Sequence, residues 1–218
     1  MTEQIATALI QTLRRCEALW HDQLVDTSNA IGADWGNVAT VDVLWSAELG
    51  AVDPRPDLCV VQLVDALPAG TPSGVIAYHT EDASGRPLCL VSYVAAGSDW
   101  PSAMSHELHE SKIDATLNLT ATAPDGSVWD LETDDPVEGS DYPENGVMVS
   151  NCAGPRYFGL AQDGPMDIAG AVTAPFQQLP TGYHALADGS QVFGARVSAA
   201  KVAQARSPWG RPGRRTRV

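Results

Sequence analysis

The sequence predicts an α+β fold in which a mixed sheet of about four or five strands packs on an N-terminal helix and a second, later helix. Apolar residues recur at helical spacing over residues 2–24, and a second helical segment covers about residues 100–116. Strand-like stretches bounded by turn residues lie at 38–45, 58–64, 74–79, 87–95 and 191–197. Residues 161–190 hold many Gly and Pro residues, so an irregular C-terminal third is expected.

Local chemistry sets the boundaries of the two helices and of one hairpin. Residues 26–36 are rich in Ser, Asn, Gly and Asp, so the first helix is expected to give way to a loop there. Residues 80–86 place Asp, Ser and Gly between two strand patterns, which favours a hairpin. Pro101 suits the first turn of the second helix, with Ser98 or Asp99 as its N-cap.

The charge balance limits the classes of partner. The chain of 218 residues has 27 acidic and 13 basic side chains and a net charge of −14, which disfavours general binding to nucleic acid or to an anionic membrane. No apolar stretch is long enough for a transmembrane helix. The N-terminus lacks the pattern of a secretory signal. We therefore expect a cytoplasmic protein, or a member of a larger assembly, without a membrane partner.

Residues 1–205 are predicted to form a single domain, and residues 206–218 an arginine-rich tail. The tail is the segment expected to contact an acidic partner, nucleic acid included, and a disordered terminus is the alternative. The 4 cysteines are scattered and form no Cys-x-x-Cys pair. Buried free thiols are therefore expected, rather than a disulfide framework or a cysteine-ligated zinc ion.

The strongest chemical signal is the run from His106 to Glu110, His-Glu-Leu-His-Glu, in the second helix. His106 and Glu110 are four residues apart, so their side chains project side by side. This is the ligand spacing of HExxH zinc helices, with a glutamate in place of the second histidine. A carboxylate oxygen binds zinc at a distance similar to that of an imidazole nitrogen. Zn²⁺ is thus the expected cofactor, with another divalent cation as the alternative, and Glu107 is the predicted general base.

A third metal ligand is expected from the acidic stretch at residues 124–145. Asp135 and Glu138 are the best candidates, and the sequence leaves the choice between them open. Asp114 lies eight residues beyond His106, which is about 12 Å along a helix. It is therefore expected to support the ligands or to anchor the helix. A charge-rich stretch of this kind is also typical of a solvated loop, or of a calcium site with oxygen ligands.

Four motifs follow one another along the chain. They are Trp35-Gly36, the segment Gly74–His79, the segment Ser105–Asp114, and Asp135–Glu138 followed by Tyr142. With these motifs, residues 5–160 resemble a group of bacterial and phage proteins that carry a zincin-like metallopeptidase signature, and the arginine-rich C-terminus is similar as well. The resemblance implies a zincin-like fold and the attack of a metal-activated water on a peptide carbonyl.

The resemblance also implies supporting residues around the metal ligands. His79 and Tyr142 are expected near the site. The strand at 74–79, or its hairpin partner at 87–95, is expected to border a cleft where an extended peptide could pair with it. The alternative for His79 is a structural histidine at the end of a strand. His109 falls beside the ligand stripe of the helix and is interpreted as a surface residue.

Two functions from different classes fit these patterns. The first is a zinc-dependent metallopeptidase that acts on a peptide or protein substrate. The second is a non-catalytic structural or assembly protein of a phage virion, a head or tail component that retains the fold. An acidic body with a basic tail would suit assembly with other proteins or with further copies of the chain.

Overall fold

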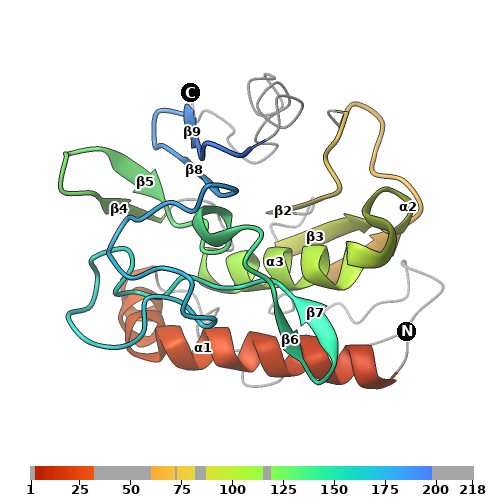
Figure 1. The fold of residues 1–218 in the computed structure, drawn as a ribbon, viewed down its shortest axis with the longest axis horizontal. Coiled ribbons are helices and arrows are strands. Elements are labelled where there is room, and N and C mark those ends of the chain that lie inside the picture. Colours follow the sequence, from red (N-terminus) through yellow and green to blue (C-terminus); the bar gives the residue numbers. More distant parts are fainter. Residues whose placement is uncertain (1–2, 32–59, 72, 82–86, 115–118, 198–218) are drawn as a thin grey trace.

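The computed structural model describes residues 3–31, 60–71, 73–81, 87–114 and 119–197. This part of the chain has an α+β architecture, with a mixed three-stranded sheet, three two-stranded hairpins and two long helices (Figure 1). The predicted strand at 38–45 and the arginine-rich tail at 206–218 lie outside the described residues.

Helix α1 spans Glu3–Ile31 and runs along one side of the molecule (Figure 1). The apolar stripe expected from the sequence is buried, as at Leu9, Leu13 and Trp20. The helix is longer than predicted, because it continues over residues 26–31, where a loop was expected. The Ser, Asn and Asp residues of this segment are weak helix formers but not helix breakers. None of the described helices is long and apolar enough to cross a lipid bilayer.

The three-stranded sheet has the order β1-β3-β2. β1 (Val60–Val64) runs parallel to β3 (Pro87–Ser92), and β2 (Ala77–Glu81) runs antiparallel to β3, so the sheet is mixed, as predicted. Among the described residues it has three strands instead of the predicted four or five, because residues 191–193 pair with residues 183–185 in a separate hairpin. The central strand is buried on both faces, from Cys89 to Ser92. The β2–β3 register pairs His79 with Cys89, and both strands pack on the second long helix.

This second helix, α3 (Trp100–Ile113), follows a short helix α2 (Tyr93–Ala96) and a 3-10 turn η3 (Gly97–Asp99). Pro101 lies in its first turn, as predicted, and Asp99 is the N-cap residue, although its side chain makes no capping hydrogen bond. α3 contacts the sheet on one side and α1 on the other (Figure 1). This central position buries polar side chains on several faces of the helix.

Residues 119–197 consist of hairpins, one 3-10 turn and irregular segments, and residues 161–182 in particular are irregular, as predicted. The elements are β4 (Thr120–Thr122), β5 (Val128–Asp130), η4 (Asp135–Val137), β6 (Tyr142–Glu144), β7 (Val147–Val149), β8 (Tyr183–Ala185) and β9 (Gln191–Phe193). An aromatic cluster holds these segments together, since Trp129 packs against Tyr157, Phe176 and His184.

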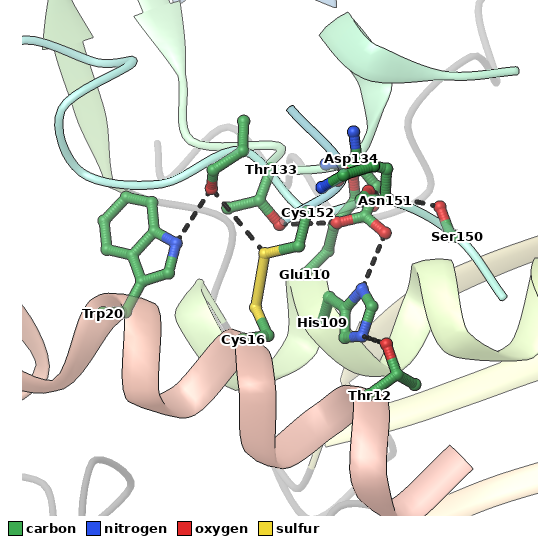
Figure 2. The surroundings of a disulfide bond; sticks show 12 residues. Thr12, Cys16, Trp20, His109, Glu110, Thr133, Asp134, Ser150, Asn151 and Cys152 are labelled. Carbon is green, nitrogen blue, oxygen red and sulfur yellow. Dashed lines mark hydrogen bonds and ion pairs between the residues drawn. A yellow bond between two sulfur atoms is a disulfide. The ribbon is translucent and has the colours of Figure 1, made fainter. Parts of the chain in front are cut away.

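A disulfide joins Cys16 in α1 to Cys152 (Figure 2). The expectation of free thiols at these two positions is therefore wrong, because folding brings together cysteines that lie 136 residues apart. The bridge lies beside Trp20, whose indole N–H donates a hydrogen bond to the carbonyl of Ala153 over 2.9 Å. Cys89 is a buried free thiol, as expected. The disulfide thus fastens α1 to the segment that follows β7.

Loss of this bridge is expected to destabilise the fold. Replacing both Cys16 and Cys152 by Ser removes a crosslink that closes a long loop, and such a loss typically lowers the free energy of unfolding by about 2–4 kcal/mol. Urea unfolding of the non-reduced protein measures the change, with Cys89→Ser as the control for a serine at a buried cysteine. A double variant as stable as the wild type would contradict a structural role for the disulfide.

Candidate metal centre

Helix α3, strand β2 and the segment around η4 bring six ligand-type side chains together. They are His79, His106, Glu107, Glu110, Glu132 and Asp135. Most of their side-chain surface is inaccessible to solvent. Two groups of three residues within this set each offer ligand atoms that lie within 4.8 Å of one another, and Glu110 belongs to both groups.

His106, Glu110 and Asp135 form the first group. Nε2 of His106 lies 3.2 Å from Oε1 of Glu110 and 3.2 Å from Oδ1 of Asp135. Two atoms that bind one zinc ion tetrahedrally at about 2.1 Å are about 3.4 Å apart. The three side chains are therefore spaced as ligands of a single ion.

Strong electrostatic coupling connects the members of this first group. Burial opposes a charge on His106, but the charge of Glu110 and a hydrogen bond with Asp135 raise the pKa of His106 well above its usual value. Burial raises the pKa of Glu110 to about 7, the charge of Asp135 adds to this rise, and His106 opposes it. A divalent cation among these groups would replace the proton on the imidazole and compensate the buried carboxylates.

His79, Glu107 and Glu110 form the second group. Nδ1 of His79 lies 3.1 Å from Oε2 of Glu107 and 3.5 Å from Oε2 of Glu110. Its Nε2 is 3.7 Å from Oε2 of Glu132, and this buried nitrogen has no hydrogen-bond partner among the described residues. Burial, followed by the charges of Glu110 and Asp135, raises the pKa of Glu132 well above its usual value. The predicted general base Glu107 thus lies beside His79.

A buried chain of hydrogen bonds fixes the segment before η4 against α3 (Figure 2). Nδ1 of His109 donates to Oδ2 of Asp134 over 2.8 Å, and Nε2 lies 3.0 Å from Oγ1 of Thr12 in α1. The same Thr12 hydroxyl is 2.7 Å from the hydroxyl of Tyr142. The backbone N–H of Asp134 donates to Oε1 of Glu110 over 3.2 Å. The interpretation of His109 as a surface residue is therefore wrong, and Tyr142 supports this chain of hydrogen bonds rather than the ligands directly.

Two further predicted residues lie outside both groups. Asp114 is the C-cap residue of α3, and its Oδ2 accepts a hydrogen bond from the backbone N–H of Leu119 over 2.9 Å, which is the position of a helix anchor. Glu138 follows the last residue of η4 and is its C-cap. Of the two candidates for the third ligand, the structure brings Asp135 to His106 and leaves Glu138 out of the group.

Much of the acidic stretch is buried, so the solvated-loop interpretation is wrong for its central part. Asp130, Glu132, Asp134 and Asp135 all have little solvent exposure. The sequence does contain a pattern that could have predicted this burial, since apolar residues such as Leu131 lie between the acidic residues. Nothing in the local sequence marks Thr12 as a partner of His109, because the two residues are 97 positions apart.

No protein-family model, no curated protein and no solved structure matches the chain. The metal chemistry of the site therefore rests on the residues of the chain itself. The zincin-like resemblance stays a prediction from sequence motifs.

The buried contact between His109 and Asp134 is expected to contribute strongly to stability. Replacing Asp134 by Ala leaves a buried imidazole without its acceptor, which is expected to lower the free energy of unfolding by about 3 kcal/mol. Asp141→Ala is the matched control, because Asp141 is exposed and accepts a hydrogen bond from Ser102 at the surface. Its effect is expected to stay below about 0.5 kcal/mol. Urea unfolding of both variants tests this, and equal effects would count against the interpretation.

Proposed function

We propose that the protein is a divalent-metal-dependent hydrolase of the zincin type, with Zn²⁺ as the expected ion and a peptide bond as the expected target. The observation that carries this proposal is the arrangement of His106, Glu110 and Asp135. Nitrogen and oxygen donors from a helix and from a separate 3-10 turn converge at the spacing of ligands around one ion. The motif resemblance supplies the peptidase part of the proposal.

The donor set suits a catalytic ion. One imidazole and two carboxylates supply three protein ligands, which is the number found at catalytic zinc sites that keep a fourth position for water or substrate. The side chain of His106 is 15% exposed, whereas those of Glu110 and Asp135 are 4% and 7% exposed. His106 is therefore the most exposed of the three proposed ligands.

The surroundings of this group suggest how a substrate would be used. When bound, the cation would polarise a water molecule and the carbonyl that it attacks. Glu107 is the predicted proton acceptor. Its carboxylate and that of Glu110 both contact Nδ1 of His79. Among the described strands, β2 has a neighbour on one side only. An extended peptide added to this edge would run along the strand that carries His79 into the site.

Metal content tests the ligand set. Metal-free protein that is incubated with Zn²⁺ and then desalted is expected to retain zinc, whereas His106→Ala and Asp135→Ala are expected to bind it at least tenfold more weakly. Glu138→Gln is the matched control and is expected to keep the zinc, since Glu138 lies outside the group. Elemental analysis measures the zinc, and circular dichroism shows that each variant is folded. Folded His106→Ala and Asp135→Ala variants that bind zinc as the wild type does would contradict the site.

Cleavage of a fluorescently labelled casein tests the hydrolytic part. The zinc-loaded protein is expected to release labelled peptides, a chelator is expected to stop the release, and added Zn²⁺ is expected to restore it. The variant His106→Ala is expected to be inactive under all three conditions. A protein that holds zinc in this group and cleaves no peptide bond would favour the non-catalytic assembly protein.

A further inference from the structure

Glu110 stands between two histidines that come from different elements. Its Oε1 lies 3.2 Å from Nε2 of His106, and its Oε2 lies 3.5 Å from Nδ1 of His79. At about 100° per residue, Glu110 lies about 40° from His106 and about 60° from Glu107 around the axis of α3. The two oxygens of one carboxylate are therefore presented to two separate groups of ligand-type side chains.

The group that contains His79 has the spacing of a metal site of its own. Nδ1 of His79 lies 3.1 Å from Oε2 of Glu107 and 3.5 Å from Oε2 of Glu110, close to the separation of about 3.4 Å between ligands of one tetrahedral ion. The side chains of His79, Glu107 and Glu110 are 5%, 9% and 4% exposed. Three donors thus converge in an interior position of the fold.

The second nitrogen of His79 supports the same interpretation. Nε2 is buried, has no hydrogen-bond partner among the described residues, and faces Oε2 of Glu132 at 3.7 Å. A metal-ligating histidine usually directs its other nitrogen toward a carboxylate, which sets the tautomer and the ring orientation. With Nδ1 bound to a cation, Nε2 would carry the hydrogen and point at such a carboxylate.

Packing in the core fixes the position of β2 relative to α3. His79 pairs in register with Cys89 of β3. Sγ of Cys89 lies 3.0 Å from Oγ of Ser111 and 3.4 Å from the carbonyl oxygen of Glu107. Cys89 is fully buried, so the sheet is seated on the face of α3 that presents Glu107. The second group is therefore preorganised by the core rather than assembled from mobile side chains.

We propose that a second divalent first-row transition-metal cation binds between His79, Glu107 and Glu110, so that Glu110 bridges two ions. This inference rests on the proposed function for the first ion, which His106, Glu110 and Asp135 would hold. It also changes one assignment, because Glu107 becomes a ligand in place of the proton acceptor. A carboxylate-bridged pair of ions stabilises both the attacking and the leaving oxygen of a hydrolytic displacement.

The number of ions per chain tests the inference directly. Metal-free full-length protein is dialysed against rising Zn²⁺, and native mass spectrometry counts the bound ions. The wild type and the control variant Glu138→Gln are expected to hold two ions. His79→Ala and Glu107→Gln are each expected to hold one, and Glu110→Gln is expected to weaken binding of both. Folded His79→Ala and Glu107→Gln variants that still hold two ions would overturn the second site.

Failure of this inference can be told apart from failure of the proposed function. A wild type that saturates at one ion, and that loses it in His106→Ala, would refute the second site and leave the first intact. Two ions that remain in both His106→Ala and Asp135→Ala would refute the first site, because the second site accounts for only one of them.

A spectroscopic measurement on the wild type avoids variants that fail to fold. Protein loaded with Mn²⁺ is expected to give the electron paramagnetic resonance spectrum of an exchange-coupled pair, because Glu110 would bridge the two ions. A spectrum that contains only isolated Mn²⁺ ions at saturating metal would overturn the bridged arrangement.

Discussion

The contact between His109 and Asp134 holds the candidate site together. Both side chains are fully buried, and their hydrogen bond is 2.8 Å long. Burying such a pair is unfavourable unless the remaining polar atoms also find partners, and the hydroxyl of Thr12 reaches the other ring nitrogen. With these bonds made, the chain before η4 lies along α3. The next residue, Asp135, therefore lies beside His106 of α3.

The geometry of α3 explains why one short run of residues serves three neighbours. At about 100° per residue, His106 and Glu110 share one side of the helix, whereas Glu107 and His109 point in two other directions. His109 faces α1, His106 and Glu110 face the segment around η4, and Glu107 faces β2. On a solvent-exposed helix, most of these polar side chains would face water instead of neighbouring elements. In the middle layer of the fold, each polar side chain meets a partner from a different element.

Local periodicity predicts the part of the site that depends on one helix, and no more. The side-by-side placement of His106 and Glu110 follows from their spacing. Asp135 is one of two predicted candidates for the third metal ligand, because it belongs to an acidic stretch and precedes a proline in the sequence. The contacts of His79 depend on how a sheet packs on α3. The disulfide joins residues 136 positions apart. Such contacts are set by tertiary packing, and no pattern within a short window encodes them.

The buried carboxylates are themselves an argument for a bound cation. Replacing buried ionic groups by apolar residues of similar volume is often neutral or stabilising, so packing alone does not call for them. Burial raises the pKa of Glu110 to about 7 and that of Glu132 well above its usual value, because a charged carboxylate is poorly solvated in this interior position. Residues with such shifts and specific charged partners concentrate at functional sites. A divalent cation would compensate these buried negative charges, and the same carboxylates would then bind the cation.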